Sequence, residues 1–524
     1  MTAHDDCRPG RTEPPLGLLD RRPSIAVGIV AMLYLAAAIA SIKPHNLLHL
    51  EQVHWAHWSD QSLYLTSAKA FARFDLSPDR HWYPLFYPLV AAPFTILSGQ
   101  VPFLFVDIAC YLVAFASFCR VALLFGVARA IAMPIFLATT ILYPIIGKRW
   151  AEPWTTTPSA ALIWLALACA LPLLKSPTPA RALTVRSAIT LGATLALIPA
   201  NRPADIVISL LIMGCCAGTL VFDRTRDRFA LVAIASGVSV ATLYGLLYLA
   251  IYGLRPTDYM QLSAAFGLNL RWLGWKSYIL LVEPKPWFPQ GRGLLVVCPW
   301  LPLGAAGLLA ASLRYSRARA CAACLLAVAA VYASVMLGYV DLLPSGLWYY
   351  QNVHYFKWLL PLFGLFAWLF LRDVRSAPWL SGAMLAGVLM LTCIRLYPVP
   401  VASDAPARAV VFDRPAAGDE TIYMARSTIS DRGGLQRNFF DYHQVAAGPR
   451  VIAIAARRDF AGGEAWRGNA AADVPWPPSP HGVVTFDQPL PGRWPRGAVA
   501  RYAVGWTIGW SCWLPPYACG GGAL

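Results

Sequence analysis

Repeated apolar runs occupy this chain from residue 23 to residue 396, and they constrain its fold more than any other feature. Many of them approach the roughly 20 residues that an α-helix needs to cross the hydrocarbon core of a bilayer. Only 13% of the 524 residues are charged, whereas an ordinary soluble domain has about 25%. The sequence therefore predicts an all-α membrane domain rather than a soluble globular protein.

We expect about eleven transmembrane helices from these runs. A further apolar run at 84–98 is short and rich in proline, and it either dips into the membrane or crosses it. Dipping preserves a higher density of Lys and Arg in the loops of one side, as the positive-inside rule requires, and is preferred for that reason. The expected spans are 23–42, 101–119, 130–146, 159–174, 187–200, 206–222, 229–253, 294–312, 320–340, 356–371 and 378–396.

The net charge of +16 comes largely from basic residues in the short loops between these runs. This pattern is typical of membrane proteins and does not indicate a nucleic-acid partner. The basic segment 1–22 is expected in the cytoplasm, which places the first outer loop, 43–100, on the opposite side. We therefore expect a multi-pass membrane protein, in contact with the lipid bilayer along its length.

The tail, 397–524, is too polar to continue the membrane domain, 23–396. Short segments such as TIYMA and GVVTFD alternate with Gly, Pro and Asp, as strands and turns do. We expect a small β-rich or mixed domain in the periplasm. Together with the long aromatic loop 254–290, its outward placement makes it a candidate for choosing the acceptor of any reaction.

Two acids in the expected outer loops are candidates for acid–base chemistry. Asp60 precedes a helical pattern in the first outer loop, and Glu152 lies in the loop GKRWAEPWTTTP. An aspartate with an ordinary pKa of about 3.9 is ionised at neutral pH and can accept a proton from a hydroxyl group. Structural alternatives are a helix N-cap for Asp60 and a solvated charge paired with Arg149 for Glu152.

Basic residues predicted near the same side could neutralise a phosphate group. The candidates are Arg202, Arg292 and Lys357, and Arg292 stands between two glycines that would let the backbone approach a ligand. For Arg292 and Lys357 the alternative is interfacial snorkelling, in which a long basic side chain reaches from an apolar surface to water.

The remaining polar candidates point less clearly to a function. The spacing of His54, His57 and His81 is a weak metal-binding pattern, and Gln61 rather than an acid follows the first outer-loop acid. We expect no cofactor and do not favour a metal. Asp107 lies inside an apolar run near its outer end, where a functional intramembrane acid and a solvated helix cap both stay open.

Four stretches follow one another in an order that is more specific than any one of them. They are Asp60 with Tyr64 and Ala68 at helical spacing, YPLFYPLVAAPF at 83–94, GRGLLVVCPWL at 291–301, and KWLLP at 357–361. In this order they resemble motifs of the GT-C superfamily of integral-membrane glycosyltransferases. The similarity is greatest to the bacterial branch related to protein O-mannosyltransferases and the lipid A aminoarabinose transferase.

The resemblance implies a polyprenyl-phosphate sugar donor, an acceptor that is a glycan, lipid or protein, and inversion at the anomeric carbon. It implies that Asp60 is the catalytic base, that Glu152 assists it, and that Arg292 and Lys357 hold the phosphate, in a protein of a bacterial inner membrane. Arg202 is a further candidate for holding the phosphate. Contacts with donor or acceptor are expected from three further residues: Tyr64, His81 and Tyr83.

Two departures from the family pattern leave the donor chemistry open. Gln61 stands where the mannosyltransferases carry a glutamate, and the second span carries Asp107 where an arginine is often found. A transporter or flippase of lipid-linked sugars is the alternative, and it predicts inverted repeats and functional charges at the bilayer midplane. A third possibility is a non-catalytic scaffold for cell-wall assembly, in which Asp60 would be dispensable.

Overall fold

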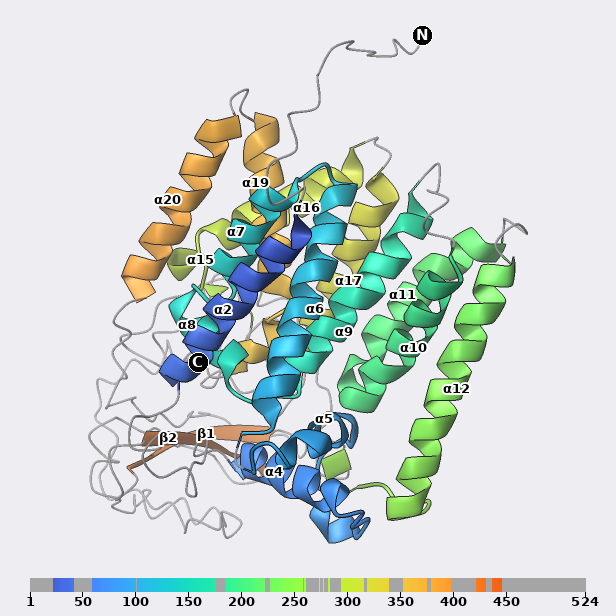
Figure 1. The fold of residues 1–524 in the computed structure, drawn as a ribbon. Coiled ribbons are helices and arrows are strands. Elements are labelled where there is room, and N and C mark those ends of the chain that lie inside the picture. The colour runs from blue at the N-terminus through green and yellow to red at the C-terminus, as the bar shows by residue number, and fades with distance from the viewer. Residues whose placement is uncertain are drawn as a thin grey trace, which may run out of the picture.

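Helices form nearly all of the chain that the computed structural model describes, and they stand side by side as a bundle (Figure 1). The described residues are 22–41, 59–99, 101–175, 184–221, 227–257, 259–260, 273, 277, 281–282, 294–314, 318–338, 352–374 and 378–396, with the backbone of 421–429 and 436–444. Within these ranges the predicted helical architecture of the membrane domain is confirmed. Most of the expected tail domain and most of the aromatic loop 254–290 lie outside them.

Each expected span coincides with one helix or with two consecutive helices. In the described part of the chain, five helices are long and apolar enough to cross a membrane: α2 (Pro23–Ser41), α6 (Phe103–Leu124), α9 (Thr156–Leu174), α12 (Asp227–Tyr252) and α17 (Arg319–Gly338). Seven other described helices at the expected spans are shorter: α7 (Arg129–Thr139), α8 (Pro144–Ala151), α10 (Val185–Asn201), α11 (Ile206–Val221), α15 (Leu294–Val297), α16 (Trp300–Leu313) and α19 (Leu359–Val374). The last expected span is α20 (Pro378–Leu396), which has 19 residues. The total of about eleven spans stays a prediction.

Two of the expected spans, 130–146 and 294–312, are broken helices rather than continuous ones. The first divides into α7 and α8 just before Pro144, and the second into α15 and α16 at Cys298 and Pro299. A proline cannot donate a backbone hydrogen bond and disfavours helical geometry in the residue before it, so the helix restarts at the proline. The Tyr143 hydroxyl contacts the Cys298 sulfur, so the two breaks meet inside the bundle.

The first outer loop forms a layer of short helices across one end of the bundle (Figure 1). It contains α4 (Ser59–Ala72), the 3₁₀ turn η2 (Pro78–Arg80), α5 (Phe86–Ala91) and η3 (Ala92–Thr95). The apolar run from Phe86 to Thr95 is about 15 Å long if fully helical, half of the roughly 30 Å needed to cross the hydrocarbon core. The segment 84–98 is therefore too short to span the membrane alone.

Small residues let neighbouring spans approach at backbone distance. A Cβ added at Gly192 of α10 would lie 1.9 Å from the carbonyl oxygen of Ala233 in α12. A Cβ at Gly304 of α16 would lie 2.2 Å from the carbonyl oxygen of Phe363 in α19. Such close approach is typical of helices that associate within lipid, where the hydrophobic effect does not hold them together.

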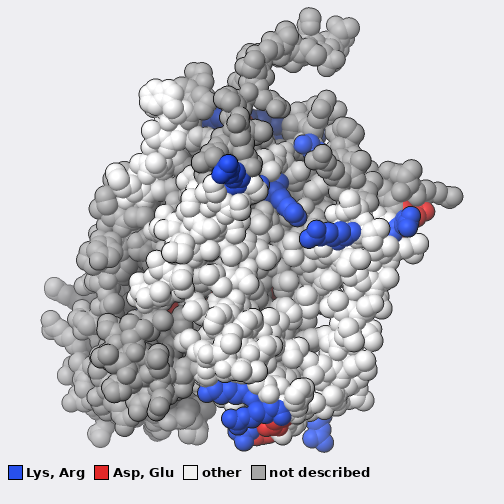
Figure 2. Space-filling view, viewed as in Figure 1, with Lys and Arg blue, Asp and Glu red and all other residues white. Residues whose placement is uncertain are grey.

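The outer surface of the bundle is apolar over a broad band. Figure 2 shows charged side chains gathered at the two ends of the described part, with very few between them. Within this band the side chains of α12 are open to the surroundings, since Leu231 is 67% exposed and Leu243 is 68% exposed. A water-facing helix would not present leucines in this way, so the band is the lipid-facing surface of a membrane protein.

Two strands belong to the tail. β1 (Thr421–Ile429) pairs antiparallel with β2 (Gln436–Gln444), with Thr421 opposite Gln444 and Ile429 opposite Gln436. β1 begins at the predicted strand TIYMA, whereas β2 was not expected from the sequence. The other predicted strands, including GVVTFD, lie outside the described residues.

Candidate active site

Asp60 lies in the first turn of α4, at the end of the bundle covered by the first outer loop. Its carboxylate is hydrogen-bonded to the phenol of Tyr83 and lies close to Tyr64, one helical turn further along α4. The two tyrosine rings are 4.8 Å apart, centre to centre. Burial and then the Asp60 charge raise the pKa of both phenols well above the usual range, so both remain protonated donors.

Glu152 follows the last residue of α8 and is buried, with 4% of its surface exposed. The carboxylate accepts a hydrogen bond of 2.6 Å from Arg149 and one of 3.3 Å from the indole of Trp154. The pairing with Arg149 agrees with the structural alternative for this residue, but the charge is not solvated as that alternative assumed. The loop is also shorter than expected, because GKRWA forms the last residues of α8.

Gln61 connects the two acid-bearing segments directly. Its side-chain amide is 5% exposed and donates a hydrogen bond of 3.2 Å to the carbonyl oxygen of Pro153. Gln61 follows Asp60, and Pro153 follows Glu152, so the contact brings the neighbours of both acids together across 92 residues of sequence. The residue that departs from the family pattern is therefore a bridge between α4 and residues 152–157, called the 152–157 segment below.

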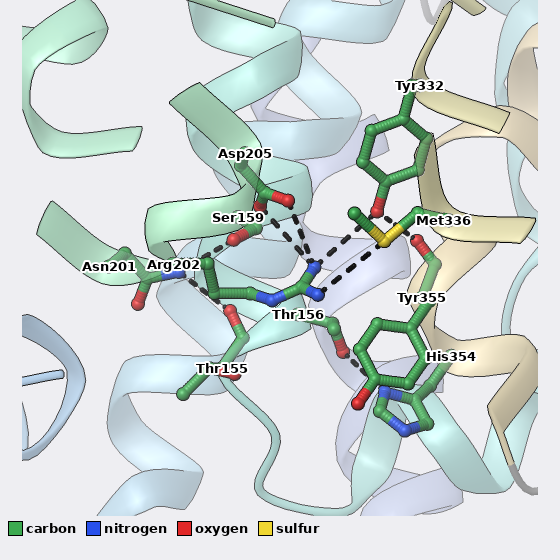
Figure 3. Close-up of polar contacts among 10 residues, drawn as sticks. All are labelled: Thr155, Thr156, Ser159, Asn201, Arg202, Asp205, Tyr332, Met336, His354 and Tyr355. Atoms are coloured by element: carbon green, nitrogen blue, oxygen red, sulfur yellow. Dashed lines mark hydrogen bonds and ion pairs between the residues drawn. The ribbon is translucent and has the colours of Figure 1, made fainter. Parts of the chain in front are cut away.

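Arg202 lies in the turn after α10 and is held on several sides (Figure 3). One guanidinium nitrogen lies 3.3 Å from a carboxylate oxygen of Asp205 and 3.5 Å from the Tyr332 hydroxyl, and the group stacks 4.7 Å from the ring centre of Tyr355. Burial is the largest single effect and disfavours its charge, but the Asp205 carboxylate and the neighbouring tyrosines together outweigh burial and raise the pKa of Arg202. The Asp205 carboxylate partly neutralises the charge of Arg202, which makes Arg202 less available as a phosphate ligand.

Asn201, the neighbour of Arg202, fixes the start of α9. Its side-chain nitrogen donates hydrogen bonds of 2.8 Å to the Thr155 carbonyl and 2.7 Å to the Ser159 hydroxyl (Figure 3). Thr155 also hydrogen-bonds Tyr64 of α4. The 152–157 segment is thus tied to α10 and to α4 at the same residue.

Lys357 lies in the turn between η8 (Asn352–Phe356) and α19, so it precedes the helix that forms the expected span of 356–371. The span begins later because the backbone from Asn352 to Phe356 forms a 3₁₀ helix before α19 starts. The ammonium group donates a hydrogen bond of 2.7 Å to the Thr157 hydroxyl and lies 5.3 Å from the ring centre of Trp150.

The ammonium group of Lys357 is 1% exposed, which excludes the snorkelling alternative. Burial is the largest cause that lowers the pKa of Lys357, to about 7, against the opposing charges of Asp107 and Glu152. The positive charges of Arg149 and Arg202 lower it further. A lysine with this pKa changes its charge near neutral pH and can respond to a bound anion.

His354 lies in the same group of buried polar residues as Lys357, and it was not predicted from the sequence. Its ring stacks on Trp154 at 4.3 Å, and its Nδ1 lies 3.1 Å from the Thr156 hydroxyl. Burial and the Lys357 charge lower the pKa of His354 well below its usual value, so the ring is neutral. The only available signal was its position three residues before Lys357.

Two predicted residues have other roles. His81 was expected to touch substrate, but its Nδ1 lies 2.7 Å from the Ser67 hydroxyl and its Nε2 lies 2.9 Å from the Asp75 carbonyl. Its ring also packs on Phe71, so His81 fastens the turn after α4 to that helix. The solvated-cap alternative for Asp107 is wrong, because the carboxylate is buried and accepts the Tyr87 hydroxyl proton at 2.8 Å from each oxygen.

The remaining candidates cannot be placed. Arg292, His54 and His57 lie outside the described residues. Within the residues that the structure describes, no group of three or more His, Cys, Asp or Glu side chains is arranged to hold a metal ion. The site assembled here therefore contains two acids, Asp60 and Glu152, and two cations, Arg202 and Lys357.

Comparison with known proteins gives one structural similarity. No family model and no curated protein matches the sequence. The fold is similar to the crystal structure of ArnT from Cupriavidus metallidurans bound to undecaprenyl phosphate, with a TM-score of 0.46 and 14% sequence identity. The match covers 74% of this chain and 66% of that chain. A similarity at this level assigns no activity to this chain.

Proposed function

We propose that this chain is a membrane glycosyltransferase that moves a sugar from a polyprenyl phosphate to a hydroxyl group of an acceptor. The observation that carries the proposal is the position of the 152–157 segment between the two halves of the site. Gln61, next to Asp60, binds this segment at Pro153, and Lys357 binds it at Thr157. The candidate proton acceptor, Asp60, is thus held beside the 152–157 segment through its neighbour Gln61. The candidate phosphate ligand, Lys357, is held beside the same segment.

In the proposed reaction the acceptor hydroxyl gives its proton to the Asp60 carboxylate. The acceptor oxygen forms a bond with the anomeric carbon as the bond from that carbon to the phosphate oxygen breaks. The electron pair of the broken bond leaves on the phosphate, whose charge is stabilised by Lys357. Attack opposite the leaving group inverts the anomeric carbon, and the products are the glycosylated acceptor and the polyprenyl phosphate.

The surrounding residues support this division of roles. Tyr83 donates to the Asp60 carboxylate and orients it. Glu152 is neutralised by Arg149, so we assign it an electrostatic role near Lys357 rather than that of a second base. In the proposed orientation this end of the bundle faces the periplasm, and the lipid tail of the donor lies along the apolar band of the surface.

The test is sugar transfer from a panel of radiolabelled polyprenyl-phosphate sugars in membranes that contain the full chain. We expect transfer by the wild type and a loss of about 100- to 10,000-fold in Asp60→Asn at equal expression. Asp79→Asn is the matched control, because Asp79 lies in the same outer segment, has a 74% exposed side chain and pairs only with Arg80 among the described residues.

Undiminished transfer in Asp60→Asn would remove Asp60 as the base. If the wild type transferred no sugar but moved a lipid-linked sugar across the membrane, the enzyme proposal would be replaced by the transporter. These outcomes are separable, since the first is a difference between variants and the second is a property of the wild type.

A further inference from the structure

A cavity of about 380 Å³ opens at the end of the bundle opposite the candidate active site. It is lined by the ends of α6, α9, α16 and α19 that lie away from α4 and α5 (Figure 1). α9 runs from the 152–157 segment to Lys175, and its 19 residues span about 28 Å. This length matches the roughly 30 Å hydrocarbon core, so the cavity opens at the opposite membrane surface.

The lining of this cavity is divided into an apolar part and a cationic part. Leu124, Phe125, Leu369 and Phe370 form apolar walls. The cationic part consists of Lys175, Arg314 and Arg372, and the lining contains one acid, Asp373.

The charges stand at the mouth of the cavity. The side chains of Arg314 and Arg372 are 55% and 34% exposed, and both pair with Asp373. The lining contains three basic side chains and one carboxylate, so its net charge is positive. The mouth of the cavity therefore favours an anion.

We propose that this cavity binds an acidic phospholipid, with its phosphate group at Arg314 and Lys175 and an acyl chain against the apolar walls. The two parts of the lining fit the two parts of such a lipid. A zwitterionic lipid lacks the net negative charge that the mouth favours, and a free phosphate ion would leave the apolar walls uncovered. With the active site facing the periplasm as proposed, this mouth lies at the cytoplasmic leaflet, whose surface is negative.

Small residues of α16 line the cavity where this helix packs against α19. Gly307 of α16 lines the cavity, and a Cβ there would lie 2.2 Å from the Phe366 carbonyl oxygen of α19. One turn further, Ala310 and Ala311 also line the cavity and fill little of the space that larger side chains would occupy. Lipid bound here would contact α6, α9, α16 and α19 at once and stabilise their arrangement.

The test measures binding of phosphatidylglycerol to the purified full chain by native mass spectrometry and by the lipid-dependent shift of its thermal unfolding midpoint. Phosphatidylcholine and inorganic phosphate are the parallel ligands. The variants are Arg314→Gln, the double variant Lys175→Gln with Arg314→Gln, and Ala310→Leu, which narrows the cavity without removing a charge. Arg186→Gln is the control, since Arg186 is an exposed cation at the start of α10, at the same end of the bundle and outside the cavity lining.

We expect phosphatidylglycerol to bind more tightly than phosphatidylcholine. Arg314→Gln should weaken it about fivefold and the double variant roughly 25-fold, since one basic residue near an anionic surface contributes about 1 kcal/mol. Ala310→Leu should also weaken binding, and Arg186→Gln should not. Equal binding of both lipids, equal effects of Arg314→Gln and Arg186→Gln, or a full midpoint shift with inorganic phosphate alone would overturn the proposal. Sugar transfer is not a readout, so failure of the enzyme proposal would leave this result standing.

Discussion

The pKa of Lys357 gives the proposed site a pH dependence that can be worked out in advance. Burial lowers this pKa from 10.5 to about 7, and the charged form is needed to hold the donor phosphate. A sugar donor is a phosphodiester, which lacks the second ionisation near pH 6 that a phosphate monoester has, so its charge is constant above neutral pH. Above pH 7, binding must therefore take up one proton, and the apparent affinity falls about tenfold per pH unit.

From pH 7, where half of the Lys357 side chains are charged, to pH 9 the donor should bind about 50-fold more weakly, a change of about 2.3 kcal/mol in binding free energy. The free protein should respond in the opposite direction. A lysine whose folded-state pKa is lowered destabilises the fold while charged, and this penalty is fully present below pH 7. It is relieved as the pH rises from 7 towards 10.5, so the free energy of unfolding increases over the range in which donor affinity decreases.

The variant Lys357→Arg isolates this effect, because a guanidinium group stays charged throughout the range. We expect a flat affinity profile from pH 7 to pH 9. Lys148→Arg is the matched control, since Lys148 is 57% exposed and lies 3.7 Å from Glu152, and it should keep the wild-type profile. Donor binding can be followed by tryptophan fluorescence, because Trp150 lies beside the ammonium group. A flat wild-type profile, or the same slope in Lys357→Arg, would refute the assignment of Lys357 to the phosphate.

Two further predictions concern the scaffold of the site. Gly192→Ala should lower the free energy of unfolding by about 1–3 kcal/mol, because the added Cβ would lie 1.9 Å from the Ala233 carbonyl oxygen; Gly245→Ala in α12 meets nothing within 4 Å and should be neutral or stabilising by up to about 1 kcal/mol. A thermal unfolding series in one detergent compares the two, and equal midpoints would contradict the close approach of α10 and α12. Asn201→Ala should lower stability by about 1–3 kcal/mol and weaken donor binding, because the Thr155 carbonyl loses its buried donor; unchanged stability and binding would show that the 152–157 segment does not depend on this contact.

The sequence indicated the helices well, because the length of an apolar run is a local property of the chain. It did not predict that two of the expected spans, 130–146 and 294–312, are interrupted. Pro144 and Pro299 are visible as residues, but proline also occurs inside continuous helices here, as Pro172 does in α9. Which proline interrupts a helix depends on whether the freed backbone groups find partners in the surrounding bundle, and those partners come from distant parts of the chain.

The site was predictable in its residue types and not in its contacts. Asp60, Glu152 and Lys357 could be singled out from their places in the expected outer loops and from the resemblance. The hydrogen bond from Lys357 to Thr157 joins residues 200 positions apart, and no periodic pattern in the sequence predicts it. For His81, a contact with donor or acceptor was expected, and the structure shows instead that its two ring nitrogens contact the Ser67 hydroxyl and the Asp75 carbonyl oxygen.

The bridge from Gln61 to Pro153 also restricts which residues this chain can carry beside Asp60. The atom that Gln61 meets is a carbonyl oxygen, which only accepts hydrogen bonds. An ionised glutamate at position 61 would place its carboxylate oxygens, which only accept hydrogen bonds, against the Pro153 carbonyl oxygen, which also only accepts. Pro153 has no backbone N–H group that could donate to such a carboxylate. Two consecutive ionised acids at 60 and 61 are therefore incompatible with the observed path of the 152–157 segment, and a relative with that pair must route this loop differently.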